Sequence, residues 1–229
     1  MNEEHNPRQF DDDYAWQDDY TELHLDDATY GDFDWDDLDP KLVDRHDAIL
    51  EMDAEALGAL DDASLDDFHR WAAARAWLRV DQPERFQALT RKILSTAHDK
   101  RTKLLSYPDI TLALARALAA EGDLDDALAH LETYRLLDGA DGAEHARHMG
   151  LILLESDQHV KGLDILLDAL KTYREEEPEL GLHLAEDLLE LGQKDAARAV
   201  LDAARQQAAE HDQRELLQEL NDTIAAYFN

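Results

Sequence analysis

The chain has 229 residues, enough for one or two domains with a sizeable core. It contains no cysteine, which excludes disulfides and thiolate chemistry, and 54 acidic against 22 basic residues give a net charge of −32. Such a surface repels nucleic acid and anionic membranes and attracts cations or basic partners, so we expect neither of the first two as a partner. Adaptation to a salty cytoplasm and a function that needs negative potential both explain the acidity, and composition leaves both open. No apolar stretch approaches the roughly 20 residues of a membrane span and no signal-peptide pattern is present, so we expect a cytoplasmic protein.

Residues 1–40 differ from the rest of the chain. They carry 15 acidic side chains and one base, Arg8, with aromatic residues between the acids. Self-repulsion of the charges predicts an extended, disordered tail. Its composition resembles the acidic tails with which histone chaperones and some activation domains grip basic or apolar partners, so Phe33 and Trp35 are predicted partner-binding residues. The alternative is a plain leader, or a segment that packs on the helices that follow it.

Residues 41–107 show helical apolar spacing and form the predicted second region. Two short helices are expected in 41–60 around Asp53, followed by a pair at 65–80 and 83–97. Ser64 and Asp67 resemble a capping pair at the start of that pair, and Pro83 suits the first turn of its second helix. The pair is interpreted as a degenerate helical hairpin, out of phase with the copies that follow.

Residues 108–229 contain one unit three times, in 108–138, 141–174 and 178–210, followed by an amphipathic segment at 212–228. The turns of the copies align at Gly122, Asp157 and Gly192, which are 35 residues apart. Small residues occur five positions after each turn and seven before it, where two helices can approach closely; they are Ala127, Gly162, Ala197, Ala115, Gly150 and Ala185. A fixed period of this length predicts stacked helical hairpins, with the last segment as a capping helix.

The pattern Leu114-Ala115-x₂-Leu118 with Ala127-x₃-Leu131, which returns in the next two copies, resembles the tetratricopeptide repeat (TPR). The copies depart from that family because no Trp opens them, Leu replaces both aromatic residues, no Pro closes them, and the period is one residue longer. The resemblance implies an all-α, right-handed α-solenoid of about three TPR-like hairpins with extra N-terminal helices, a C-terminal cap and the acidic tail.

Such an array has an inner face on the first helix of each hairpin. The alignment predicts an apolar strip with mixed charge at its edges, suited to an amphipathic helix or an extended peptide. The predicted partner-binding residues are Leu112, Arg116, Ala119, Arg147, Leu151, Leu154, Glu155, Leu182, Glu186 and Leu189. Alternatively, about half of these leucines pack between hairpins. TPR domains that clamp chaperone tails use a Lys- and Asn-rich ring on this face, which this chain lacks.

No nucleotide-binding, zinc-protease or calcium-loop motif occurs, and no cofactor or enzymatic activity is expected. Two Glu–His pairs, Glu144/His148 and Glu179/His183, lie 35 residues apart on the first helices of the second and third copies. Imidazole and carboxylate together can hold a divalent metal, whereas the same i, i+4 spacing also occurs in ordinary helix-stabilising contacts.

The sequence therefore predicts a non-enzymatic protein–protein interaction module, of scaffold, adaptor or chaperone-like type, that binds a partner segment in the groove with help from the acidic tail. The alternatives are an acidic nucleic-acid mimic or sequestrant of a basic protein, and a metal-binding protein or hydrolase.

Overall fold

The computed structural model describes residues 29–31 and 33–228. Within these residues every regular element is helical, and a single isolated bridge pairs Tyr30 with Leu105. The chain divides into two compact units, Met1–Ser106 and Tyr107–Asn229. The division falls one residue before the predicted boundary between 107 and 108.

The first unit is built around α4, which packs against α5, α2 and α3. Its helices are α2 (Pro40–Leu50), α3 (Ala54–Gly58), α4 (Asp67–Arg79) and α5 (Pro83–Leu94), with 3-10 turns η1 (Trp35–Asp37), η2 (Asp62–Ser64) and η3 (His98–Lys100). Trp71 of α4 is fully buried, and its ring centroid lies 5.8 Å from that of the buried Phe86 of α5. Trp77 of α4 is buried as well, so both tryptophans of this helix are core residues.

The predicted capping pair of α4 was wrong. The N-cap is Asp66, whose carboxylate accepts the backbone N–H of His69 at 2.9 Å, so the helix begins at Asp67. Ser64 instead ends the preceding 3-10 turn, where its hydroxyl donates to the carbonyl of Asp61. Aspartate is as good an N-cap as serine, because its side chain accepts hydrogen bonds from the free amides of the first turn.

Part of the segment predicted to be disordered is ordered. The backbone of residues 29–31 runs antiparallel to 103–106, and Tyr30 is buried. Charge repulsion argued for an extended segment throughout 1–40, but here burial of an aromatic ring and side-chain hydrogen bonds outweigh it. The rest of the predicted tail, residues 1–28 and Asp32, lies outside the described residues.

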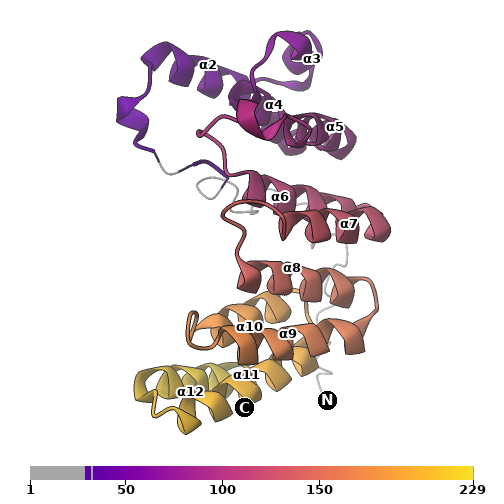
Figure 1. Cartoon of the computed structure of the whole chain (residues 1–229). Coiled ribbons are helices and arrows are strands. Elements are labelled where there is room, and N and C mark those ends of the chain that lie inside the picture. The colour runs from indigo at the N-terminus through magenta and orange to yellow at the C-terminus, as the bar shows by residue number, and fades with distance from the viewer. Residues whose placement is uncertain (1–28, 32, 229) are drawn as a thin grey trace, which may run out of the picture. The chain divides into compact units, whose positions relative to one another are not determined.

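The second unit contains the three predicted hairpins and the terminal helix, in which neighbouring helices pack as pairs (Figure 1). Its helices are α6 (Tyr107–Ala120), α7 (Leu124–Tyr134), α8 (Gly142–Glu155), α9 (His159–Tyr173), α10 (Leu180–Glu190), α11 (Lys194–Glu210) and α12 (Arg214–Phe228). The pairs are α6 with α7, α8 with α9, and α10 with α11. Helix α8 also contacts α6 and α10, α9 contacts α11, and α12 packs on α11. The hairpin prediction is confirmed at this level.

Each hairpin turns on a residue with left-handed backbone at the aligned position. The φ angles are 86° at Gly122, 60° at Asp157 and 69° at Gly192. In each case the next amide reaches back to a carbonyl in the last turn of the helix, as in Asp123 N–H to Leu118 O at 2.9 Å. This is the hydrogen-bond pattern of the Schellman motif, which glycine adopts most easily and which aspartate tolerates. The turns therefore recur every 35 residues because each copy has, at the same position, a residue that adopts the left-handed conformation.

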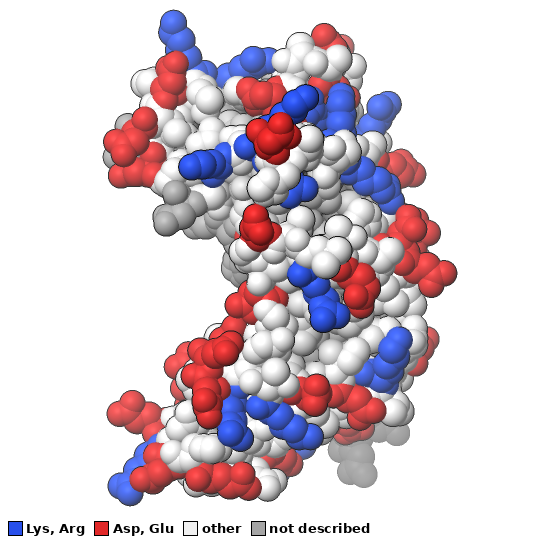
Figure 2. Space-filling view, viewed as in Figure 1, with Lys and Arg blue, Asp and Glu red and all other residues white. Residues whose placement is uncertain are grey.

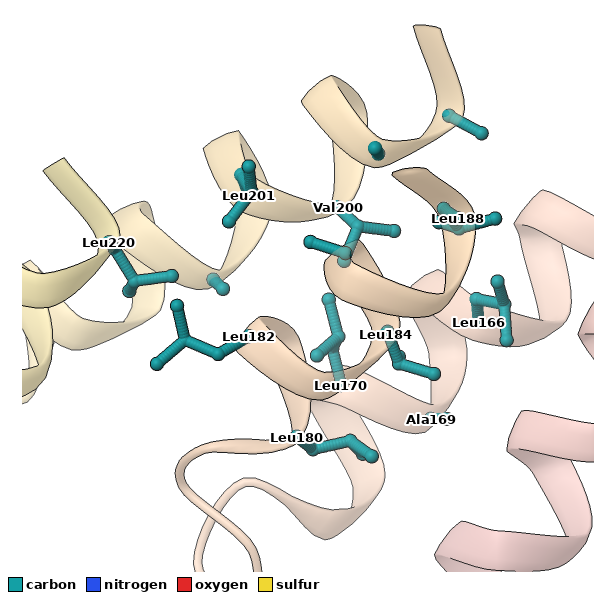
Figure 3. Packing of buried hydrophobic residues seen from close by; sticks show 14 of the residues in the cluster. Leu166, Ala169, Leu170, Leu180, Leu182, Leu184, Leu188, Val200, Leu201 and Leu220 are labelled. Carbon is teal, nitrogen blue, oxygen red and sulfur yellow. The ribbon is translucent and has the colours of Figure 1, made fainter. Parts of the chain in front are cut away.

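Small residues let the paired helices come close, most clearly in α8 and α9. A Cβ atom added to Gly162 would lie 2.7 Å from the backbone oxygen of Gly150 and 2.8 Å from Cγ of Leu154. Behind this contact, leucines from α9, α10, α11 and α12 form one continuous core (Figure 3). The residues labelled there are Leu166, Ala169, Leu170, Leu180, Leu182, Leu184, Leu188, Val200, Leu201 and Leu220.

The capping helix α12 presents apolar residues to α11 and polar residues to solvent. Leu220 and Ile224 are buried, whereas Glu215, Gln218 and Asp222 are exposed. None of the described helices combines the length and the hydropathy that a bilayer-spanning segment requires.

Candidate binding face

The first helices of the three hairpins, α6, α8 and α10, form a row in which α8 contacts both neighbours. Arg116, Leu151 and Glu186 occupy equivalent positions of the three copies, 35 residues apart, so the repeat places them in one line across this row. Arg116 and Glu186 are exposed and Leu151 is half-buried.

The predicted partner-binding residues of this unit separate into accessible side chains, which are exposed or half-buried, and buried ones. Glu155 is exposed like Arg116 and Glu186, and three others are half-buried like Leu151; these are Ala119, Arg147 and Leu189. We call the set Arg116, Ala119, Leu151, Glu155, Glu186 and Leu189 the binding face.

Three predicted residues must be withdrawn from any surface. Leu112, Leu154 and Leu182 are only 5%, 2% and 7% exposed. Leu112 packs in a small core with Leu131 and Ile152, and the other two belong to the main core of this unit. Because each first helix contacts its own partner and its neighbours, apolar side chains on more than one side of it become buried.

A charged network joins α8 to α10 beside the binding face. Arg147 donates to both carboxylate oxygens of Asp187, from Nε to Oδ2 at 2.6 Å and from Nη2 to Oδ1 at 2.8 Å. Its third nitrogen, Nη1, donates to Oε1 of Glu144 at 3.1 Å. Burial opposes the charged guanidinium, but these two carboxylates outweigh it and raise the pKa of Arg147. The bidentate contact fixes the position of one hairpin against the next.

Glu144 also faces His148, with 3.4 Å between its Oε2 and Nε2 of the imidazole. Hydrogen bonding with His148, followed by the charge of Arg147, lowers the pKa of Glu144 to about 2. Burial lowers the pKa of His148, and the charges of Arg116 and Arg147 act in the same direction. A neutral imidazole carrying its proton on Nε2 satisfies both observations, because it donates to a charged carboxylate.

The two Glu–His pairs have different surroundings. The His148 side chain is 12% exposed, whereas Glu179 and His183 are exposed. Among the described residues no group of three or more metal-ligating side chains comes together. A two-residue pair such as Glu144 and His148 supplies half the ligands of a closed tetrahedral zinc site.

The two aromatic candidates of the acidic segment, Phe33 and Trp35, lie in the first unit. Their ring centroids are 5.1 Å apart, and Trp35 also contacts the rings of Tyr30, His46 and Phe68. Trp35 keeps 38% of its surface exposed. The structure therefore engages these rings in their own unit and does not leave them on an extended tail.

Sequence reasoning missed Asp187, the carboxylate that holds Arg147. The two residues are 40 positions apart, five more than the repeat, so alignment of the copies could not pair them. Their complementary charges on adjacent first helices were the one available signal.

Acidic side chains are spread over the visible surface of α8 to α12, with basic side chains between them (Figure 2). A shallow hollow lies on another part of the same unit, along α9, and is lined by Ala146, Val160, Lys161, Asp164, Ile165, Asp168, Ala169, Thr172 and Tyr173.

Comparison with known proteins finds no match: no protein-family model, no curated protein and no solved structure matches this chain.

Proposed function

We propose that the second unit is a non-enzymatic protein-binding module whose binding face takes a basic, amphipathic segment of a partner protein. The proposal includes the finer architecture that the repeat suggests, a right-handed solenoid of TPR-like hairpins. It is supported by the repeat-generated line of accessible side chains across three neighbouring helices.

The chemistry of the face suits that partner. Leu151 of α8 and Leu189 of α10 offer half-buried apolar surface, and the same two helices carry the exposed carboxylates of Glu155 and Glu186. Arg147 adds no free positive charge, because Asp187 and Glu144 neutralise it. An amphipathic helix with leucines on one side and lysines at its edges would cover the apolar strip and meet the acids.

Charge alone supports a second candidate, a sequestrant of basic proteins. The net charge of −32 attracts any basic chain, and the acids are not confined to the binding face. The two functions make different predictions: a face-specific module depends on where a charge is changed, whereas a sequestrant depends only on how many charges are changed.

A matched pair of charge reversals separates them. Glu186→Lys changes the binding face, and Asp164→Lys makes the same change at an exposed position of α9. The probe is a fluorescein-labelled 18-residue Leu/Lys amphipathic peptide, with a scrambled peptide of identical composition as reference, and binding is followed by anisotropy. We expect Glu186→Lys to weaken binding about fivefold, equal to about 1 kcal/mol, and Asp164→Lys to change it less than about twofold.

A second pair tests the apolar strip. Leu151→Ser removes half-buried surface from the face, and Val160→Ser removes a side chain that is 78% exposed on α9. Only the first should weaken binding. Equal weakening by Glu186→Lys and Asp164→Lys, or equal binding of the scrambled peptide, would replace the module by the sequestrant. Absence of any binding by the unmodified chain would contradict both.

A further inference from the structure

The segment 29–31, which we call the strap, is attached to the first unit by backbone and side-chain hydrogen bonds. The amide of Gly31 donates to the carbonyl of Leu104 at 3.2 Å, and the amide of Ser106 donates to the carbonyl of Thr29 at 2.9 Å. The indole N–H of Trp71, on α4, donates to the hydroxyl of Thr29 at 3.0 Å. The strap thus lies directly over a fully buried tryptophan.

Tyr30 is the centre of the strap. Its hydroxyl lies 2.6 Å from Nε2 of His46, on α2, and accepts a hydrogen bond from Nη1 of Arg75, on α4, at 2.9 Å. The other nitrogen of His46, Nδ1, lies 3.0 Å from a carboxylate oxygen of Asp47. A carboxylate only accepts, so Nδ1 carries the imidazole proton and Nε2 accepts the proton of the Tyr30 hydroxyl.

A second proton on His46 would disrupt this set of hydrogen bonds. An imidazolium would direct an Nε2–H bond at the Tyr30 oxygen, which already accepts from the Arg75 guanidinium. The hydrogen bond from the Tyr30 hydroxyl to Nε2 would then be lost, and the imidazolium and the guanidinium would both point at the Tyr30 oxygen. His46 is 2% exposed and stacks on Phe68 with 4.7 Å between centroids, so water cannot replace the lost contact without movement of the strap.

Among the residues that the structure describes, the charges that act on His46 come from three elements. Asp47 lies on its own helix α2, Arg75 and His69 lie on α4, and Tyr30 belongs to the strap. Burial lowers the pKa of His46, the two cationic or titratable groups of α4 act in the same direction, and Asp47 opposes them without reversing the result.

We propose that the strap is a pH-released closure of the first unit: protonation of His46 detaches residues 29–31 and uncovers the aromatic surface of Phe68 and Trp71 beneath them. The device is independent of the binding face and of the function proposed for it.

The direction follows from linkage. A histidine with a lowered pKa in the closed form binds its proton more readily once the strap has opened, where its pKa returns to about 6.5. The closed form therefore keeps its full stability above that pH and becomes less stable as the pH falls below it. Between pH 7.5 and 5.5 the ratio of open to closed strap should rise by up to about tenfold, the limit for one group that protonates only in the open form.

The test is amide exchange measured by NMR, expressed as protection relative to the intrinsic rate at each pH. We expect protection of Gly31, Ser106 and the Trp71 indole to fall by several-fold up to about tenfold at pH 5.5, while amides in the middle of α4 stay protected. In His46→Gln, which cannot be protonated, the decrease should disappear. In His98→Gln, which removes an exposed histidine of the same unit, it should remain.

Three results would overturn the proposal. They are unchanged strap protection in the unmodified chain, the same decrease in His46→Gln, and equal loss of protection across α4, which would indicate unfolding of the whole unit. If His46→Gln does not fold, the imidazole resonances of His46 in the unmodified chain decide the question. They must titrate with the midpoint at which strap protection is lost, and a different midpoint contradicts the proposal.

Discussion

The spacing of α8 and α9 depends on the absence of a side chain at Gly162. The nearest obstacle to an added methyl group is the backbone oxygen of Gly150 at 2.7 Å, with Cγ of Leu154 at 2.8 Å. A side chain could rotate away, but a carbonyl of the facing helix cannot, so Gly162→Ala must push the two helices apart. Overpacking of this kind costs about 1–3 kcal/mol, and the better helix propensity of alanine returns about 1 kcal/mol. The difference between these two effects is a net loss of up to about 2 kcal/mol, with about 1 kcal/mol at the middle of the range.

Urea denaturation followed by circular dichroism measures this loss. Gly58→Ala is the matched control, because Gly58 ends α3, has no atom within 4 Å of an added Cβ, and reports the same chemical change without a clash. It should be neutral or stabilise its unit by up to about 1 kcal/mol. A Gly162→Ala chain that is stabilised as much as the Gly58→Ala chain would refute the close-packing argument for α8 and α9.

Two further predictions concern the charged network beside the binding face. Asp187→Ala leaves the half-buried guanidinium of Arg147 with Glu144 alone and should destabilise the second unit by about 1–3 kcal/mol in urea denaturation. The control Glu132→Ala removes the exposed ion pair with Arg135 and should change the stability by less than about 0.5 kcal/mol. Equal effects of the two variants would show that the bidentate contact adds no more stability than an exposed pair. Because the pKa of Glu144 is lowered to about 2 from 4.5, its ionised form contributes stability above pH 4.5 that is lost as the pH falls toward 2, so Glu144→Gln should destabilise the unit more at pH 6 than at pH 3. A penalty independent of pH would contradict the assigned pKa.

The hairpins of the second unit could be predicted because their signals are local and repeated. Gly122 and Gly192 mark turns by their own conformational freedom, and alignment then assigned Asp157 to the same place although it is not glycine. The small residues Gly150 and Gly162 indicated close helix contact, and the structure places them against each other. Signals of this kind lie within one hairpin and return in the other copies, so that alignment strengthens them.

The candidate site was predicted less well, because exposure depends on neighbours that the period does not reveal. Leu151 and Leu154 are three residues apart on α8, yet the first remains half-exposed and the second is buried in the main core. Helical periodicity gives the angle of a side chain about its own helix, whereas burial depends on which other helices occupy that angle. The contact of Arg147 with Asp187 was not predicted for the same reason, because it depends on which helices lie next to each other.

The strap shows where a prediction from overall composition fails. Acidity correctly indicates that residues such as Asp34 and Asp37 prefer water, and both are exposed. Tyr30 becomes ordered because three distant partners, His46, Arg75 and Leu105, surround it. The average charge of 40 residues does not reveal that one aromatic ring among them has a buried site formed by residues distant in the sequence.

The turn between α4 and α5 shows that the turn geometry depends on nearby residues alone, whereas the 35-residue period does not. Asp81 has φ of 57°, and the next amide donates to the carbonyl of Trp77 at 3.0 Å, the same geometry as in the three repeats. Yet Asp81 precedes Gly122 by 41 residues and not by 35. A Schellman turn depends on a few consecutive residues, whereas the period depends on one hairpin packing against a similar one. Helix α4 packs against α2 and α3 as well as α5, so the hairpin of α4 and α5 has neighbours of another kind although its turn is the same.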